Sequence, residues 1–353
     1  MNKLEFRNEL IKRVDEDPLY NFLKREPLKD NIVLLGLGGS YAYGTNNENS
    51  DLDLRGVAVH STRDILTGQG FDHVVNTETD TTVYSLRKIV HLLSNCNPNT
   101  IEILGLEPWQ YLKVSEIGEM LINNASLFLS KRAVRSFGGY ANAQLWRLKN
   151  KAIRTADQSS QEQHILNSIE SARYSFPEKY FYYPDDAINL YVDKALDEDH
   201  DSEIFMDVNL KHYPLRDYKD MWAEMHNIVK SYNKLGMRNS KAIEHGKLGK
   251  HMMHLVRLYL MAFDILEDGK IVTYRTKEHD FLMDIRNGKY LDENDQPTKE
   301  FYDIVETFES KLDDLSRTSP LPAFPDYEKI DDLVVSINER ILSKDQRGEN
   351  EKG

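Results

Sequence analysis

Cysteine is almost absent from the chain. Cys96 is the only cysteine among 353 residues, so no disulfide can form within the chain. Proteins without disulfides suit a reducing compartment, and we therefore expect a cytoplasmic protein. For Cys96 itself we expect burial as a small apolar side chain rather than a reactive thiol.

Long apolar segments are also missing. No run approaches the roughly 18 apolar residues that a transmembrane helix needs, and residues 1–9 contain no apolar signal region. Apolar residues make up 40% of the chain and charged residues 29%, which is typical of a soluble globular protein. These properties argue against a membrane protein, and 353 residues suffice for two domains with separate cores.

The chain lacks an excess of positive charge. Its formal net charge is −13, whereas broad, non-specific binding of nucleic acid requires a basic surface. A local basic groove is compatible with this total, because acidic residues at a metal site and in loops add to the sum. Charge therefore leaves open whether the substrate is a nucleic acid, a small nucleotide or a protein.

A glycine-rich turn comes after the first apolar segment of the chain. Residues 31–37 are read as a buried strand, and Gly38, Gly39 and Ser40 come directly after it. Such a turn offers backbone N–H groups and a hydroxyl to phosphate oxygens. A glycine turn alone often reflects only backbone geometry, so its meaning depends on the residues that come after it.

Two aspartates come shortly after this turn. Asp51 and Asp53 flank Leu52 at the start of a strand expected over 52–59, and side chains two apart in an extended chain point to one face. Adjacent carboxylates repel each other unless a cation lies between them. Mg²⁺ is the natural candidate, because it prefers a few carboxylates together with water and phosphate oxygens. The pattern indicates metal-dependent nucleotide chemistry.

Together these features resemble the signature of the polymerase-beta-type nucleotidyltransferase superfamily, which has a glycine turn, then Asp-apolar-Asp, then a third acid on a later strand. Residues 39–45 and 50–57 are similar to a narrower bacterial and phage family of RNA-repair-associated polymerase-beta-like proteins. The other segments that resemble this family are 84–88, 97–104, 250–258 and 284–288. At Tyr41 the chain departs from the family, which commonly has an arginine there as a phosphate contact.

The resemblance implies an α+β protein, with a small mixed-sheet nucleotidyltransferase domain followed by a mostly α-helical domain. It implies transfer of a nucleoside monophosphate from an NTP, such as ATP, to an acceptor hydroxyl with release of pyrophosphate. Two Mg²⁺ ions, replaceable by Mn²⁺, would be held by Asp51, Asp53 and a third acid. The family name implies an RNA 3′ end, such as that of a tRNA, as the acceptor.

The third acid has two candidates. Residues 76–84 alternate at strand period and overlap a strand expected over 74–82, and they contain Glu78 and Asp80 on one face. Asp80 lies just before the segment 84–88, where the family has an acid. We therefore favour Asp80 as the third metal ligand and catalytic carboxylate, with Glu78 as its alternative.

Nucleotide binding is assigned by the resemblance and by charge. We expect the β- and γ-phosphates at Gly38, Gly39 and Ser40, with help from Ser50 and Thr45, which are also ordinary turn or cap residues. Arg55 could contact phosphate or pair with one of the aspartates.

A helix predicted over 243–268 has a cationic face. This face contains Lys247, Lys250 and His254, with His251 and Arg257 nearby. It could contact the triphosphate or the acceptor, or its histidines could be core residues beside an apolar stripe. His251 and His254 have a metal-ligand spacing, but no acid in sequence completes a zinc motif. Further cleft candidates are Asn99, Glu102, Tyr274, Arg275 and Arg286, although Asn97 to Glu102 is also a plain helix start.

The organisation expected from these patterns has three parts. They are a catalytic domain over 1–115, a helical domain over 116–330, and a C-terminal helix with a disordered tail over 331–353. Beyond residue 116 we expect helices, including one over 184–197, and no strand. The acidic segment 197–201 is expected to be an exposed connection.

Two other functions compete with this hypothesis. The same chemistry could act on a protein hydroxyl or a small molecule, because a fold does not fix its acceptor. A catalytically silent, antitoxin-like nucleotide-binding module is the other alternative. An intact pair of repelling carboxylates argues against a silent site. The sequence leaves the preferred NTP and the oligomeric state open.

Overall fold

A computed structural model of the chain describes residues 2–48, 50–155, 158–180, 183–184, 186–196, 202–232, 247–293 and 295–350. The chain divides into two compact units. Unit 1 comprises Met1–Leu145, Lys250–Asn287 and Glu300–Gly353, and unit 2 comprises Trp146–Gly249 and Gly288–Lys299. The domain limits expected at 115 and 330 stay predictions. The predicted acidic connection at 197–201 lies outside the described residues.

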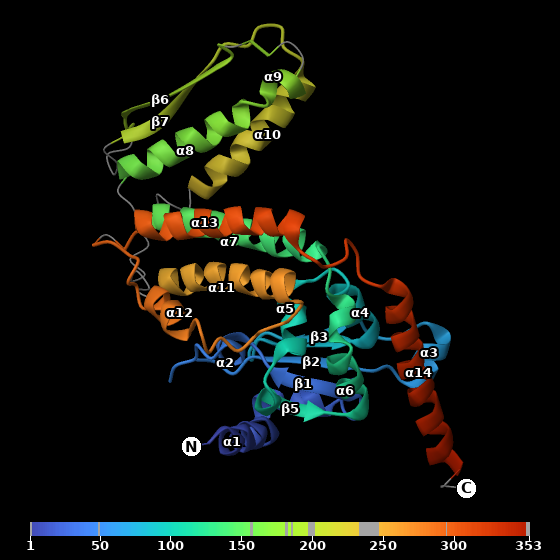
Figure 1. Ribbon diagram of the computed structural model, residues 1–353. Helices are drawn as coiled ribbons and strands as arrows, with labels where there is room; N and C mark the ends of the chain where they lie inside the picture. The colour runs from blue at the N-terminus through green and yellow to red at the C-terminus, as the bar shows by residue number, and fades with distance from the viewer. Residues whose placement is uncertain are drawn as a thin grey trace. The chain divides into compact units, whose positions relative to one another are not determined.

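Unit 1 contains a five-stranded mixed sheet with the order β3-β4-β2-β1-β5 (Figure 1). Its strands are β1 (Ile32–Leu37), β2 (Leu54–Ala58), β3 (His73–Asn76), β4 (Thr81–Ser85) and β5 (Tyr111–Val114). Only β2 and β4 pair in parallel, whereas the other neighbours are antiparallel. All six residues of β1 are buried, in line with the continuous apolar run that predicted a buried strand.

Helices surround this sheet. The first half of unit 1 adds α1 (Lys3–Glu16), η1 (Pro18–Lys24), α2 (Gly39–Tyr43), α3 (Thr62–Thr67), α4 (Leu86–Leu93), α5 (Pro98–Ile101), η2 (Glu102–Gly105), η3 (Pro108–Gln110), α6 (Glu116–Asn123) and η4 (Ala125–Phe128). An Asn2 capping box starts α1, and its Leu10 and Val14 join the sheet residues in one core. The N-terminal helix is therefore part of the sheet's own packing.

Longer helices complete unit 1 and extend past its limits. They are α7 (Arg132–Thr155), α11 (Lys247–Asp268), α12 (His279–Arg286), α13 (Lys299–Thr318) and α14 (Tyr327–Asn350). The apolar stripe expected on α11 is buried, with Met252, Leu255 and Leu258 at 0% exposure. The red helix α14 contacts α3 and α6 (Figure 1). It continues to Asn350, so the helix expected within 331–353 takes up most of that range.

Unit 2 has a core of its own. Its elements are α8 (Gln158–Arg173), α9 (Phe176–Lys179), β6 (Ile188–Lys194), β7 (Ser202–Val208) and α10 (Leu215–Tyr232). The antiparallel β6–β7 ribbon packs Ile188 against Ile165, Phe176 and Met221 from the helices. A two-stranded ribbon is marginal by itself, so this packing explains how the ribbon persists.

The fold class predicted from the sequence is confirmed, and three element predictions are corrected. The helix predicted over 184–197 is wrong, because β6 occupies it and packs one side on α8. The strand predicted over 74–82 is two strands, β3 and β4, joined by a turn at residues 77–80. The strand β5, which pairs with β1, was missed because four residues carry little periodicity. Among the described residues, no helix is long and apolar enough to cross a membrane.

Candidate active site

The glycine turn and the aspartate pair meet because β1 and β2 are paired. Leu37 at the end of β1 lies opposite Leu54 at the start of β2, and the Gly38 N–H donates to the Asp53 carbonyl at 2.8 Å. Gly39 has φ +53°, and a Cβ built there would overlap Oδ2 of Asp53. Only glycine therefore allows the Asp53 carboxylate to rest against the turn.

The aspartates lie just before β2 rather than within it. Leu52 and Leu54 are 2% and 0% exposed, so the chain alternates as the sequence predicted. Asp51 is exposed and Asp53 is only partly buried. The Tyr20 hydroxyl donates to the Leu52 carbonyl at 2.9 Å and fixes the backbone between the two acids.

Asp53 is the electrostatic centre of the site. Burial raises the pKa of Asp53 to about 6, with a further increase from Asp80 and a smaller one from Asp51. Arg55 and Lys250 act in the opposite direction on the same carboxyl group. The structure thus brings the three predicted catalytic acids, the predicted Arg55 and the α11 residue Lys250 into one electrostatic neighbourhood.

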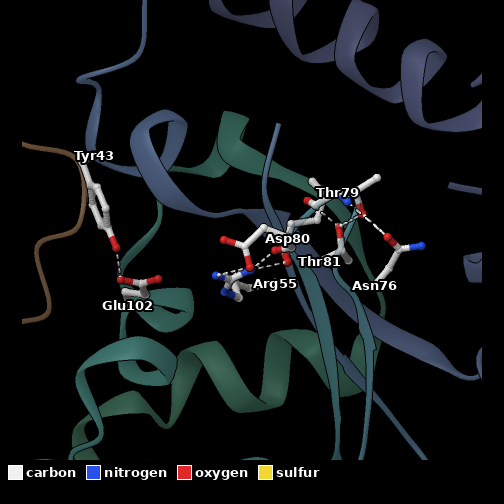
Figure 2. Close-up of polar contacts among 8 residues, drawn as sticks. Tyr43, Arg55, Asn76, Thr79, Asp80, Thr81 and Glu102 are labelled. Atoms are coloured by element: carbon white, nitrogen blue, oxygen red, sulfur yellow. Dashed lines mark hydrogen bonds and ion pairs between the residues drawn. The ribbon is translucent and has the colours of Figure 1, made fainter. Parts of the chain in front are cut away.

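Asp80 is placed by the turn between β3 and β4. The Asn76 side chain accepts from the N–H groups of Glu78 and Thr79 at 2.9 and 3.1 Å. Thr79 and Thr81 are buried and share a 2.9 Å hydrogen bond (Figure 2). Asp80 lies between them with φ +42°. The turn therefore locks the backbone on both sides of Asp80.

Arg55 pairs with Asp80 rather than with Asp51 or Asp53. Its guanidinium donates to the Asp80 carbonyl and lies 3.6 Å from the Asp80 carboxylate (Figure 2). Glu78 is exposed and is not among the groups that shift Asp53. The structure thus places Asp80 beside Arg55 and in the electrostatic neighbourhood of Asp53, and the choice of Asp80 over Glu78 as the third acid stays a prediction.

The serines of the motif differ in their surroundings. Ser40 is the second residue of α2 and is half-buried at the turn. The Ser50 hydroxyl accepts from the Asn47 N–H at 2.9 Å and lies 3.0 Å from its side-chain oxygen. Ser50 therefore stabilises a local turn, and its part in nucleotide binding stays a prediction.

A buried polar network joins α2, η2 and α11. The Tyr43 hydroxyl donates to the Glu102 carboxylate (Figure 2), and Nη1 of Arg257 lies 3.6 Å from the same carboxylate. The Arg257 guanidinium also lies 3.5 Å from the centre of the Tyr43 ring. Burial raises the pKa of both Glu102 and Tyr43, which Arg257 partly opposes. The network ties the last residue of α2, the helix at the glycine turn, to α11.

Among the remaining cleft candidates, His254 and Arg275 contact this network, whereas Arg286 and Asn99 have partners outside it. His254 Nδ1 lies 3.0 Å from Nη2 of Arg257. The Arg275 N–H donates to the Tyr43 carbonyl at 3.1 Å, and the Arg286 guanidinium donates to the Thr45 carbonyl. Asn99 contacts the Tyr140 hydroxyl at 3.4 Å. A role of His254 in nucleotide binding stays a prediction.

Sequence reasoning missed three residues that build the site. Tyr43 lies within the glycine motif but gave no chemical signal, since aromatic residues are more often core. Tyr20 donates to the Leu52 carbonyl, which lies far away along the chain, and Asn76 accepts from N–H groups within its own turn. Only Asn76 could have been found from the sequence, because asparagine favours turns and polar residues follow it through Asp80.

The donor set fits Mg²⁺. Asp51 and Asp53 supply carboxylate oxygens beside a turn that can hold phosphates, which is the ligand set Mg²⁺ prefers. Burial, followed by repulsion from Asp80 and then from Asp51, raises the pKa of Asp53, and a bound cation would favour its ionised form. Across the described ranges, no three His, Cys, Asp or Glu side chains are already gathered as metal ligands. Asp80 is held by Arg55 instead, so its part in metal binding stays a prediction.

A glycine turn closed onto an Asp-Leu-Asp pair, on a small mixed sheet, is the arrangement expected of a polymerase-beta-like protein of the nucleotidyltransferase type. Residues 11–182 match the model of the RNA repair pathway DNA polymerase beta family, which confirms the resemblance drawn from the sequence. An uncharacterised 38.9 kDa protein from the nrdC-mobD intergenic region of Enterobacteria phage T4 is 23% identical over 310 residues. That match covers 79% of this chain and 89% of the phage protein. No solved structure matches the chain.

Proposed function

We propose that the protein is a Mg²⁺-dependent nucleotidyltransferase that moves a nucleoside monophosphate from an NTP to an acceptor hydroxyl. The observation that carries this proposal is the position of the Asp53 carboxylate. It lies against the Gly39 turn, and Asp51 and Asp80 are close enough to raise its pKa. In such chemistry bound Mg²⁺ neutralises the phosphate charge that develops during displacement.

Each part of the site has a role in this reaction. Asp51 and Asp53 hold the metal, and the turn from Gly38 to Ser40 binds the triphosphate. The acceptor oxygen bonds to the α-phosphorus while the bond from that phosphorus to the α,β-bridging oxygen breaks, so pyrophosphate leaves. Asp80 accepts the proton of the attacking hydroxyl once the substrate separates it from Arg55. Lys250, on the cationic face of α11, balances the charge of the triphosphate.

For the acceptor we propose an RNA 3′ end, such as that of a tRNA. The support is the description of the matching family, which concerns RNA repair. ATP is the first NTP to test, and Mn²⁺ should replace Mg²⁺.

The experiment incubates the protein with each α-labelled NTP, Mg²⁺ and total cellular RNA. The Asp51→Asn/Asp53→Asn variant is the inactive control. Asp80→Ala and Glu78→Ala, compared side by side, separate the two candidates for the third acid. We expect label in RNA with the native protein and with Glu78→Ala, and a loss of at least about 100-fold with Asp80→Ala.

Three other outcomes would each change the proposal in a definite way. Label on protein or in a small molecule keeps the chemistry and replaces the acceptor. A loss with Glu78→Ala and not with Asp80→Ala exchanges the roles of these two acids. No transfer to any acceptor, with NTP binding retained, overturns the enzyme and leaves a nucleotide-binding module.

A further inference from the structure

The helix α7 has a charge composition unlike the rest of this acidic chain. It contains no Asp or Glu over Arg132–Thr155, although the whole chain has a net charge of −13. Its cations are Arg132, Arg135, Arg147, Lys149, Lys151 and Arg154. A helix so biased in an acidic protein is a local site of attraction for an anion.

In its second half, α7 presents an aromatic side chain among these cations. Trp146 is 66% exposed, and Arg147 and Lys149 are exposed beside it. Leu148 is fully buried, as expected for a helix position on the side opposite Trp146. The apolar face of the helix is thus already packed, and Trp146 lies on the other face. We call Trp146, Arg147 and Lys149 the α7 surface.

We infer that the α7 surface binds a single strand of RNA, the acceptor of the proposed function. Lys and Arg neutralise phosphates, and an exposed indole stacks on a base, which together form the usual means of holding single strands. This inference rests on the proposed function only for the identity of the strand as acceptor. Binding itself does not depend on transfer.

Other anionic partners fit the α7 surface less well. A helix that lies in a membrane surface needs a broad outward apolar face, whereas Phe137 and Leu148 of α7 are buried. An acidic protein would satisfy the cations but gives no stacking partner to Trp146. A strand of nucleotides uses both features at once.

The test measures binding of fluorescent single-stranded RNA by anisotropy, in the full chain carrying Asp53→Asn so that no nucleotide is transferred. In that background, Trp146→Ala should weaken binding about tenfold, as expected for one lost stacked base. Trp146→Phe should keep most of the affinity. Arg147→Gln/Lys149→Gln should lower the slope of log K against log salt by about 1.4, or about 0.7 for each phosphate contact.

Matched controls separate this surface from general effects. Leu66→Ala removes another apolar side chain, 71% exposed on α3, and should leave the affinity unchanged. Lys12→Gln/Arg63→Gln removes two exposed cations elsewhere, and should leave the salt slope unchanged. Circular dichroism checks that every variant is folded.

The inference and the proposed function fail in different ways. RNA binding that depends on the α7 surface, with no transfer by the native protein, supports the inference and overturns the function. Transfer to RNA with the same KM in native protein and α7 variants supports the function and overturns the inference. Binding to anionic vesicles but not to RNA, or equal loss in the control variants, also overturns the inference.

Discussion

Among single residues, Asp53 has an ionised carboxylate that opposes folding above about pH 6. Folding raises its pKa from 3.8 to about 6, so the folded protein binds this proton more tightly than the unfolded chain. The protonated carboxyl therefore favours the folded protein below about pH 4, and this contribution to stability is lost as the pH rises through about 6. At pH 8 the ionised group costs at most about 3 kcal/mol, and less after allowance for solvent screening.

Asp53→Asn should therefore raise the thermal stability of the metal-free protein at pH 8 and leave it unchanged near pH 4. Mg²⁺ should raise the melting temperature of the native protein at pH 8 but not that of the variant, because the repelling charge is gone. Thermal denaturation from pH 4 to 8, with EDTA or Mg²⁺, checks both statements. A variant less stable than the native protein at pH 8 in EDTA would contradict them.

Gly39 is important for a different reason, because no side chain fits between it and the Asp53 carboxylate. Gly39→Ala forces a side chain into the position of the Asp53 carboxylate. We expect nucleotide transfer to fall at least about 100-fold, since a displacement of about 1 Å in a catalytic site has an effect of that size. The control is Gly68→Ala, where φ is +68° and nothing lies within 4 Å of the added Cβ. Equal activity in both alanine variants would show that Gly39 serves only the backbone.

At the scale of elements, the network of Tyr43, Glu102 and Arg257 holds α2 against α11. Arg257 and Glu102 side chains are 2% and 5% exposed, so removing one leaves a buried charge without its partner. Arg257→Met should destabilise the protein by about 3–5 kcal/mol. The double variant Glu102→Gln/Arg257→Met should recover part of that loss, because neither charge remains.

Urea denaturation measures these stabilities. An exposed pair is the matched control, since Lys311 and Glu267 lie 2.9 Å apart with 43% of each side chain exposed. Breaking it by Lys311→Met should cost less than about 1 kcal/mol. A similar small cost for Arg257→Met would show that water reaches the network.

For the whole molecule, the first part of unit 1 depends on a segment that comes much later in the chain. The Thr273 hydroxyl donates to the Glu102 carbonyl at 2.8 Å, and the Arg275 N–H donates to the Tyr43 carbonyl. Unit 1 accordingly includes Lys250–Asn287 as well as the first 145 residues. The catalytic domain predicted over 1–115 lacks these partners.

A fragment of residues 1–115 should therefore fail to unfold cooperatively, whereas the full chain should show a sharp transition. The fragment would leave Glu102 without Arg257 and expose apolar surface of the sheet. Circular dichroism melting and dye binding compare the two proteins. A cooperative transition in the fragment would establish 1–115 as an independent domain.

The sequence determined the parts of this protein that are local. The apolar run of β1, the glycine turn and the spacing of Asp51 and Asp53 are each set by neighbouring residues, and they sufficed to predict the fold class and its resemblance. The strand β6 (Ile188–Lys194), where a helix was predicted over 184–197, could not be predicted because it is stabilised by packing on α8. Its alternation was too weak to distinguish it from a helix.

Tertiary structure decided which distant groups share the site. Asp80 reaches the neighbourhood of Asp53 because β4 pairs in parallel with β2, and a turn held by Asn76 breaks the strand that sequence had predicted there. Lys250 and Arg257 arrive from a helix some two hundred residues away along the chain. Such contacts depend on how elements pack and pair, and side-chain spacing along one segment carries no information about them.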